Sequence, residues 1–315
     1  MKKVVFMGTP SYAAKVLDAL LLAEDFEVCA VFTQPQKRAG RGQAVVQNPV
    51  KQRALEAISQ GKGALEICEI SSLKEASVQE KLASFKADFI VVAAFGQLLP
   101  KAVLDLAPCV NLHASLLPLF RGASPIQAAV LKGEKLGGVS AMNMREGLDD
   151  GEILAYQAMR VEGRNSSELF EEFGVMAADL TLKVLRNFDQ IAPLKQFDAA
   201  SSKCGKIKKE DGLVDFARDW ASEICAKNLA FCGWPGTFLQ NGVKLLEVEL
   251  GEGELGEDKD GACGEILRID ANGVAVKTRR GVLRILRVQD VGKKPILARD
   301  FCNGKRLKVG DLFEC

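Results

Sequence analysis

MKKVVFMGTPSYAAKVLDALLLAEDFEVCAVFT, residues 1–33, sets the fold class of the first half of the chain. Within it, the short β-rich run Lys3–Gly8 predicts a strand, Ser11–Asp25 predicts a helix, and Glu27–Thr33 predicts a second strand. A strand, a helix and a strand in this order are typical of a parallel α/β sheet. We therefore expect the chain to begin with an α/β domain.

The alternation of strands and helices continues downstream of this unit. A polar loop, Gln34–Asn48, leads to a helix that is expected to begin near Pro49. Further helices are expected at Val78–Phe85 and from Ser166 to Phe188. The remaining predicted strands are Leu65–Ile70, Asp88–Phe95, Cys109–His113, Gly138–Met144 and Ala155–Val161. Together these elements predict a first domain over residues 1–190.

The pattern changes beyond residue 190. Residues 191–209 lose the periodicity and carry a lysine cluster, which indicates a linker. In residues 210–315 one helix, Asp219–Cys232, precedes several short strands, and Asn241-Gly242 is typical of a hairpin with a type I′ turn. Short strands joined by tight turns predict a small β-barrel as the second domain.

Charge is distributed unevenly in this second half, although the net charge of the chain is only +1. Residues 265–308 hold 12 lysines and arginines against 4 aspartates and glutamates, whereas residues 251–261 form an acidic, glycine-rich stretch. A basic face of this kind is either simply solvated or follows a phosphate backbone. The linker residues Lys203, Lys206, Lys208 and Lys209 favour the second interpretation.

Composition excludes several classes of protein. The nine cysteines are scattered and no pair has C-x-x-C spacing, so we expect reduced cysteines that pack as small core residues. The start of the chain does not resemble a signal peptide, and no apolar run reaches the roughly 18 residues that span a bilayer. We therefore expect a cytoplasmic protein without a membrane partner. His113 is the single histidine, so a multi-histidine metal site is excluded and no metal is expected.

The segment Val110-Asn111-Leu112-His113-Ala114-Ser115-Leu116-Leu117-Pro118 contains the densest chemical information. Residues two apart on a strand share a face, so the Asn111 amide and the His113 imidazole lie side by side near the end of a predicted strand. Ligands of open α/β sheets bind at the carboxyl ends of strands. The pair is therefore a candidate catalytic site.

Asp149 is the third candidate, in Gly147-Leu148-Asp149-Asp150-Gly151. The flanking glycines permit a tight loop that can bring a carboxylate close to another segment. An aspartate-rich surface turn is the ordinary alternative, and the spacing along the chain does not connect Asp149 to His113.

That connection comes from a resemblance. Asn111-x-His113, Ser115-Leu116-Leu117-Pro118-x-x-Arg121-Gly122-x-x-Pro125-Ile126 and Gly147-Leu148-Asp149-x-Gly151 resemble the folate-dependent formyltransferase family. The branch that acts on methionyl-tRNA is matched in particular by Phe6-Met7-Gly8-Thr9-Pro10, Phe32-Thr33-Gln34-Pro35, Ala39-Gly40-Arg41-Gly42 and Asn48-Pro49-Val50-Lys51. Leu119-Phe120 and Ala114 depart from the usual pattern of that branch, and the first departure removes a basic residue from a position that would face tRNA.

The resemblance implies a Rossmann-like catalytic domain, an OB-like β-barrel that binds tRNA, and a monomer. It also implies that a formyl group moves from 10-formyltetrahydrofolate to the amino group of methionyl-initiator tRNA. Asn111, His113 and Asp149 match the catalytic triad of the family. The Asn111 amide and a protonated His113 would stabilise the oxyanion, while Asp149 would favour the charged imidazole and hold a water that carries the proton. We expect the folate against Phe95, Gly96, Leu98, Leu99, Ser115, Leu116, Leu117 and Pro118.

The resemblance further implies that the loop Gln34–Asn48 enters the acceptor stem of the tRNA. Its basic residues Lys37, Arg38 and Arg41 are the candidates for that contact, and Lys206, Lys208 and Lys209 are candidates for binding elsewhere on the tRNA. The loop is longer than most loops of α/β domains, which is typical of functional or disordered insertions.

The sequence disfavours three other functions. A nicotinamide-dependent dehydrogenase is disfavoured because the G-x-G-x-x-G spacing is absent after the first strand, where only Gly8 is present. A formyltransferase that acts on a nucleotide-linked amino sugar would use the same scaffold, but the basic second domain and the loop Gln34–Asn48 favour tRNA. An RNA-binding protein without catalysis would require the triad to be incidental.

Overall fold

The computed structural model describes residues 1–36, 38–39, 44–45, 48–61, 65–251 and 261–313, without the side chains of residues 38, 39, 44 and 45. The chain forms two compact units. Unit 1 comprises residues 1–126, 136–160 and 168–205, and unit 2 comprises residues 127–135, 161–167 and 206–315.

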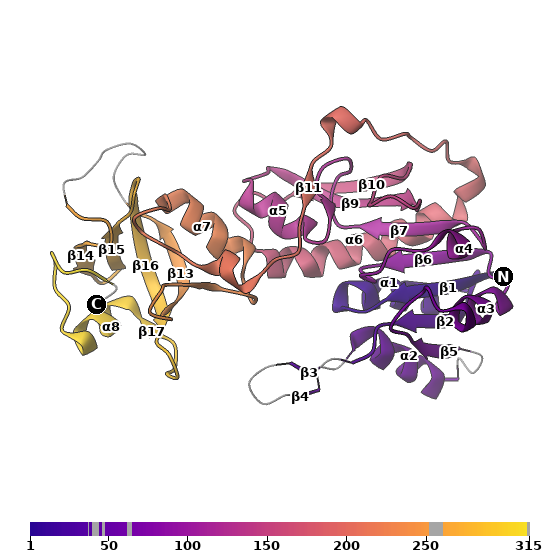
Figure 1. The fold of residues 1–315 in the computed structure, drawn as a ribbon, viewed down its shortest axis with the longest axis horizontal. Coiled ribbons are helices and arrows are strands. Elements are labelled where there is room, and N and C mark those ends of the chain that lie inside the picture. The colour runs from indigo at the N-terminus through magenta and orange to yellow at the C-terminus, as the bar shows by residue number, and fades with distance from the viewer. Residues whose placement is uncertain (37, 40–43, 46–47, 62–64, 252–260, 314–315) are drawn as a thin grey trace. The chain divides into compact units, whose positions relative to one another are not determined.

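Unit 1 contains a seven-stranded sheet in the order β10-β9-β7-β6-β1-β2-β5 (Figure 1). All the pairings from β7 through β6, β1 and β2 to β5 are parallel, which confirms the α/β class expected for the first half. The strands are β1 (Lys2–Gly8), β2 (Phe26–Thr33), β5 (Glu66–Glu69), β6 (Phe89–Ala93), β7 (Cys109–His113), β9 (Leu136–Asn143) and β10 (Ile153–Arg160).

Helices cover both faces of this sheet. On one face, α1 packs against α2 and also contacts α6 through an edge-to-face pair of Tyr12 and Phe170. On the other face, Val5 and Met7 of β1 join a core cluster with Leu82 of α3 and Val103 of α4. The helices of unit 1 are α1 (Ser11–Leu22), α2 (Pro49–Ser59), α3 (Ala76–Ser84), α4 (Lys101–Leu104) and α6 (Ser166–Arg186), followed by a 3-10 turn, η1 (Phe188–Gln190). Helix α5 (Pro125–Leu131) begins in unit 1 and lies mostly in unit 2.

The strand order reverses at β1, because β2 and β5 lie on one side of this strand and β6 and β7 lie on the other. Gly8 ends β1 opposite Ala93 at the end of β6. A Cβ on Gly8 would lie 2.8 Å from the Ala93 carbonyl oxygen and 2.6 Å from the Ala13 side chain, so this close approach of β1, β6 and α1 requires glycine. Ligands of open α/β sheets bind at such a switch point.

The segment between β2 and α2 is anchored at its described ends. Asn48 caps α2, because its side chain accepts a hydrogen bond from the Lys51 backbone N–H, and Pro49 occupies the first helical position. The Asn48 amide also donates to Thr33 Oγ1 and to the Gln34 carbonyl oxygen. Within the loop, β3 (Arg38–Ala39) pairs with β4 (Ala44–Val45), while Lys37 and Arg41 lie outside the described residues.

The sheet becomes antiparallel at β9. His113 of β7 pairs with Ser140, and Val110 pairs with Asn143 at the end of β9. The chain therefore leaves β9 beside the beginning of β7, and the loop of residues 144–152 starts at the end of β7 that is remote from His113. To bring Asp149 near His113 this loop must turn back along the sheet.

Residues 191–205 differ from the expected linker, because they belong to unit 1. Leu194 and Ile153 exchange two backbone hydrogen bonds. Further along, β11 (Lys203–Cys204) pairs in parallel with β8 (Arg121–Gly122), just after the 3-10 turn η2 (Asp198–Ala200). We call residues 194–204 the return segment. The sequence of this segment has no periodicity because backbone hydrogen bonds to loops hold it in place. The absence of periodicity does not mean that the segment lacks contacts.

Unit 2 contains an antiparallel sheet in the order β12-β13-β16-β15-β14, with β17 paired to β16, which confirms the β-rich second half (Figure 1). Ile224 of α7, Leu245 of β13, Ile285 of β16 and Phe301 of α8 belong to its core cluster. The elements are η3 (Lys209–Gly212), α7 (Ala221–Ala230), β12 (Thr237–Phe238), β13 (Lys244–Leu250), β14 (Ile266–Asp270), β15 (Gly273–Lys277), β16 (Val282–Gln289), β17 (Ile296–Leu297) and α8 (Ala298–Lys305).

The hairpin at Asn241-Gly242 is present, but its turn differs from the expected type. Gly242 has a φ of 87°, while Asn241 is not among the residues with positive φ, as a type I′ turn would require. The Gly242 N–H donates to the Leu239 carbonyl, and the Leu239 N–H donates to the Val243 carbonyl. These bonds enclose a three-residue loop whose last residue is a left-handed glycine, a common alternative hairpin.

No helix among the described residues is both long and apolar enough to cross a membrane.

Candidate active site

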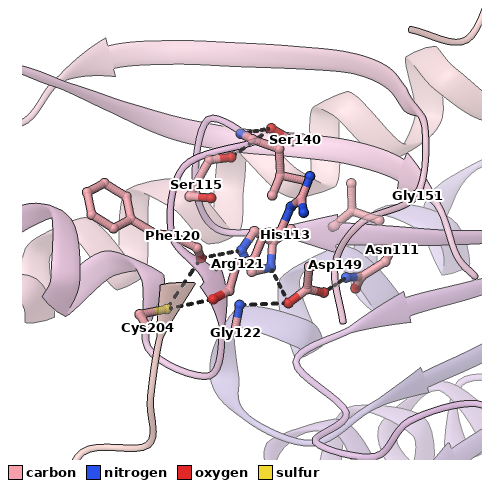
Figure 2. Close-up of polar contacts among 12 residues, drawn as sticks. Asn111, His113, Ser115, Phe120, Arg121, Gly122, Ser140, Asp149, Gly151 and Cys204 are labelled. Atoms are coloured by element: carbon pink, nitrogen blue, oxygen red, sulfur yellow. Dashed lines mark hydrogen bonds and ion pairs between the residues drawn. The ribbon is translucent and has the colours of Figure 1, made fainter. Parts of the chain in front are cut away.

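Asn111 and His113 lie on the same face of β7, as their spacing predicts, and Asp149 reaches both (Figure 2). The Asn111 amide donates to Asp149 Oδ1 over 3.4 Å, and His113 Nδ1 lies 3.7 Å from Asp149 Oδ2. All three side chains are largely buried, with 6% of the His113 side chain and 13% of the Asp149 side chain exposed. The structure therefore brings together the three residues that the sequence could connect only through resemblance.

The contact of His113 Nε2 determines which ring nitrogen carries the hydrogen of the neutral imidazole. His113 Nε2 lies 2.9 Å from the Phe120 carbonyl oxygen. Because a carbonyl oxygen only accepts, Nε2 carries the hydrogen and donates it. Nδ1, which faces Asp149, is then the atom that gains a proton when the imidazole becomes charged. The ring is thus buried among polar groups rather than in apolar packing.

Asp149 is held from two sides. Its Oδ2 accepts a 2.8 Å hydrogen bond from the Gly122 backbone N–H. Its backbone is in the left-handed region, with a φ of 51°, which is uncommon for a residue with a side chain. The neighbouring Gly151 permits this turn, since a Cβ there would meet the Asn143 carbonyl oxygen at 1.7 Å. The expectation that a flanking glycine permits a tight loop is confirmed at Gly151.

Gly122 itself requires the absence of a side chain. Its φ is 125°, and a Cβ would lie 2.1 Å from the Cys204 carbonyl oxygen on the paired return segment. A larger residue would push the two strands apart and withdraw the N–H from Asp149. Arg121-Gly122, part of the sequence motif without an assigned role, thus supplies one of the contacts that hold the Asp149 carboxylate.

The loop after His113 is built around Ser115 and Ser140. Ser115 Oγ donates to the Leu119 carbonyl, and Ser140 Oγ donates to the Ser115 carbonyl while it accepts from the Leu117 N–H. The Leu117-Pro118 peptide bond is cis. Leu117 packs in a small cluster with Met142 and Ile153, and Leu116 is half-buried. Ser140 was not predicted, because an isolated serine on a strand gives no sequence signal.

The return segment completes this loop. Ser202 accepts at Oγ from the Phe120 N–H and at its carbonyl from the Arg121 N–H, and its own N–H donates to the Pro118 carbonyl. The Cys204 thiol lies 3.3 Å from the Phe120 carbonyl that also accepts from His113. Burial raises the pKa of the Cys204 thiol, and the charge of Asp149 adds to this effect, so the thiol stays protonated and donates.

The predicted folate residues after β6 divide into two groups. Phe95 and Leu99 are buried in the core cluster of unit 1, so only their backbone is available to a ligand, whereas Leu98 is 61% exposed. Gly96 has a φ of 78°, and the Phe95 carbonyl accepts a 2.7 Å hydrogen bond from the Gln34 amide. The exposed part of this loop therefore offers backbone groups and one apolar side chain at the carboxyl end of β6.

The predicted tRNA residues are placed only in part. Arg38 lies in β3, whereas Lys37 and Arg41 fall outside the described residues. Lys206, Lys208 and Lys209 are exposed at the start of the long final stretch of unit 2. Within the described residues, no group of three or more histidine, cysteine, aspartate or glutamate side chains is arranged to hold a metal ion.

Comparison with known proteins agrees with this geometry. A family model described as formyl transferase matches residues 1–175, and a model described as the formyl transferase C-terminal domain matches residues 206–306. The chain belongs to the formyl transferase family. The first match covers Asn111, His113 and Asp149.

Two curated relatives are similar over nearly their whole length. A methionyl-tRNA formyltransferase from Campylobacter hominis is 50% identical over 309 residues, which are 98% of this chain and 99% of that protein. A methionyl-tRNA formyltransferase from Campylobacter jejuni is 48% identical over 312 residues, 99% of each chain.

Two solved structures share the fold. HypX from Aquifex aeolicus in complex with tetrahydrofolic acid is 18% identical with a TM-score of 0.60, and the match covers 96% of this chain and 47% of HypX. An N-formyltransferase from Helicobacter canadensis in complex with folinic acid and dTDP-3-aminofucose is 14% identical with a TM-score of 0.61, over 90% of this chain and 99% of that one.

Proposed function

We propose that this formyl transferase moves the formyl group of 10-formyltetrahydrofolate onto the amino group of methionyl-initiator tRNA, which produces N-formylmethionyl-tRNA for translation initiation. The observation that carries the proposal is the convergence of Asn111, His113 and Asp149 in a chain about half identical to methionyl-tRNA formyltransferases over nearly its full length.

The Asn111 amide is the first donor for the oxyanion. When an amine attacks a formyl carbon, negative charge develops on the formyl oxygen and must be met by donors that are already in place. The Asn111 amide carries two hydrogens, and Asp149 Oδ1 uses one of them. The other is available to the developing oxyanion.

His113 supplies the second contribution through Nδ1. Its Nε2–H is committed to the Phe120 carbonyl, so the charged form of the ring adds its hydrogen on the side that faces Asp149. The charged imidazole stabilises a negative formyl oxygen in a largely buried site.

Asp149 can accept the proton released by the attacking amine, directly or through a water, and return it to the folate nitrogen as the bond between that nitrogen and the formyl carbon breaks. A carboxylate has about four lone-pair sites, and the hydrogen bonds from Asn111 and Gly122 occupy two of them. The remaining sites are free for an amine or a water, which lets Asp149 act as a general base.

The formyl donor fits the loops at the ends of β6 and β7. Exposed Leu98 and half-buried Leu116 offer apolar cover for a ring, and the backbone around Gly96 offers polar groups for its edge. We assign the folate to this region, with contacts from Phe95, Gly96, Leu98, Leu99 and the run Ser115–Pro118. When bound, the folate supplies the formyl group, while the chain supplies orientation and charge.

The tRNA is the acceptor, and basic residues of both units are candidates to bind it. Several arginines and lysines of the basic second half are paired with acids, among them Arg287 with Glu247 and Lys293 with Asp290. Lys206, Lys208 and Lys209 have exposed side chains and are the better candidates. Lys37, Arg38 and Arg41 remain the candidates for the acceptor stem. We expect a monomer to bind one tRNA.

The test is a formylation assay with 10-formyltetrahydrofolate and two acceptors, methionyl-initiator tRNA and a nucleotide-linked amino sugar. We expect N-formylmethionine from the tRNA reaction and no formylated sugar, with mass spectrometry as the readout. Formylation of the sugar nucleotide without formylation of the tRNA would contradict the proposal.

A further inference from the structure

Gln196 lies in the return segment, and all its side-chain polar groups form hydrogen bonds. Two of these bonds hold the loop of residues 144–152, which we call the catalytic loop because it carries Asp149. Its Nε2 donates to the Asp149 carbonyl over 2.9 Å and to the Gly151 carbonyl over 2.7 Å, and its Oε1 accepts from Arg121 Nε over 2.9 Å. The side chain is 5% exposed. It touches neither His113 nor Asn111 in these contacts, so it acts on the backbone that carries Asp149.

The loop needs such a restraint. It leaves β9 at the end of β7 that is remote from His113, and it places Asp149 in a left-handed conformation. A residue in a sparsely populated conformation persists only where its surroundings hold it. Gln196 binds the carbonyls on both sides of residue 150 and therefore fixes the part of the loop that orients the Asp149 carboxylate.

Arg121 fixes which way the Gln196 amide faces. A guanidinium only donates, so the oxygen of the amide must point to Arg121 and its nitrogen to the two carbonyls. Arg121 is 6% exposed and forms an ion pair with Asp198, which is itself 79% exposed at the side chain. Exposed Asp198 thus holds Arg121, Arg121 orients Gln196, and Gln196 binds the loop that carries Asp149.

We propose that Gln196 is a positioning residue for formyl transfer, which keeps the Asp149 carboxylate in contact with Asn111 and Gly122. The inference rests on the proposed function, because its readout is the transfer rate. Gln196 contacts neither the folate region nor the candidate tRNA residues in the structure, so its loss reduces turnover without weakening substrate binding.

Two substitutions separate positioning from folding. Gln196→Leu removes every polar contact, and we expect kcat to fall about 100-fold with KM for both substrates nearly unchanged, since a misplacement of about 1 Å has that effect on an oriented group. Gln196→Glu keeps an acceptor for Arg121 but, as a carboxylate, repels the two carbonyls. Its neutral acid form regains one O–H donor.

The pH profile of Gln196→Glu is therefore diagnostic. We expect the ratio of its kcat to that of wild type to rise as the pH is lowered from neutral to mildly acid values, while the ratio for Gln196→Leu stays constant. A purely structural role would change only the amount of folded protein, so that kcat per folded enzyme would equal that of wild type in both variants at every pH. Thermal unfolding of each variant measures that contribution separately.

Lys195→Leu is the matched control, because it places the same side chain on the exposed neighbour of Gln196. It should keep wild-type kcat. If wild type formylates methionyl-tRNA and folded Gln196→Leu retains its kcat, or if Gln196→Glu shows no recovery at acid pH, the positioning role is wrong. If wild type itself formylates no methionyl-tRNA, the proposed function fails, and the positioning role in that reaction fails with it.

Discussion

In the proposed reaction, His113 supplies positive charge that stabilises the formyl oxygen. We expect His113→Ala to lose at least about 100-fold in turnover, the usual cost of removing one group that stabilises an oxyanion. The variant should fold, because the imidazole contributes one hydrogen bond to the Phe120 carbonyl and the loop around it keeps its contacts to Ser202 and Ser140. Steady-state kinetics and circular dichroism measure the two effects.

His113→Asn is a useful second variant, because its amide restores an N–H donor on a shorter side chain. A folded His113→Ala enzyme with near wild-type turnover would mean that the imidazole does not take part in the transfer.

At this scale the sequence predicts the residues on one strand but not the partners brought by distant loops. Asn111 and His113 share a face because strand periodicity places them there. Asp149 was linked to them only by resemblance, since the loop that carries it starts at the far end of β7. Gln196 and Ser140 had no signal, because their roles arise from backbone carbonyls that no sequence pattern reveals.

A buried side-chain hydrogen bond from Tyr12 connects helix α1 to strand β7. Tyr12 Oη donates to the Leu112 carbonyl over 3.0 Å, between Asn111 and His113. Burial raises the pKa of Tyr12 above its ordinary value of 10.0. The phenol is therefore neutral in the folded protein at pH values where it ionises in the unfolded chain.

This shift gives a prediction about stability. Below pH 10 the phenol is neutral in both states, and Tyr12→Phe should lower the free energy of unfolding by about 1 kcal/mol through the lost hydrogen bond. Above pH 10 the unfolded wild-type chain releases a proton that the folded one retains, so wild-type stability falls as the pH rises. Tyr12→Phe lacks this loss, and the difference between the two proteins should shrink.

Urea unfolding over this pH range measures the effect. Tyr156→Phe is the control, because its ring is 55% exposed and makes no comparable contact with β7. Parallel stability curves for wild type and Tyr12→Phe would contradict the assignment.

Elements were predicted well where periodicity determines them, and less well where tertiary contacts do. The strand Cys109–His113 has its expected bounds, while α1 ends at Leu22 instead of Asp25, since Ala23 is already extended. The antiparallel direction of β9 was not foreseen, because a short apolar strand does not encode its pairing. The sequence predicts a linker over residues 191–209, whereas residues 194–204 pair through their backbone with unit 1, and such pairing leaves no periodicity in the sequence.

For the whole molecule, the net charge of +1 hides opposed local charges. Part of the basic surplus of residues 265–308 is neutralised by ion pairs, for example between Arg268 and Asp270. The described cysteines are free, as expected, but only Cys29, Cys109 and Cys302 are buried core residues, whereas Cys232 is exposed. Burial raises the pKa of Cys109 to about 12.

The exposed Lys206, Lys208 and Lys209 give a prediction about the salt dependence of tRNA binding. Each phosphate contact that is lost reduces the slope of log affinity against log salt by about 0.7 to 0.9. Replacement of Lys206, Lys208 and Lys209 by glutamine should weaken tRNA binding and flatten that slope by about 2 to 3. The KM for the formyl donor should stay constant.

Filter binding of methionyl-tRNA at several salt concentrations measures the slope. A matched triple replacement of Lys74, Lys86 and Lys132, which are exposed elsewhere, serves as the control. An unchanged slope in the first variant would show that these lysines do not face the tRNA.

Because this polypeptide has one imidazole, and that ring sits beside Asp149 with its Nε2 hydrogen given to Phe120, the molecule carries a natural spectroscopic reporter. Nitrogen-15 labelling of histidine in untagged protein would yield a single set of ring resonances that needs no assignment by mutagenesis. Their chemical shifts distinguish the two neutral tautomers from the cation, so each ligand added to the tube could be followed by its effect on one proton at the reaction centre.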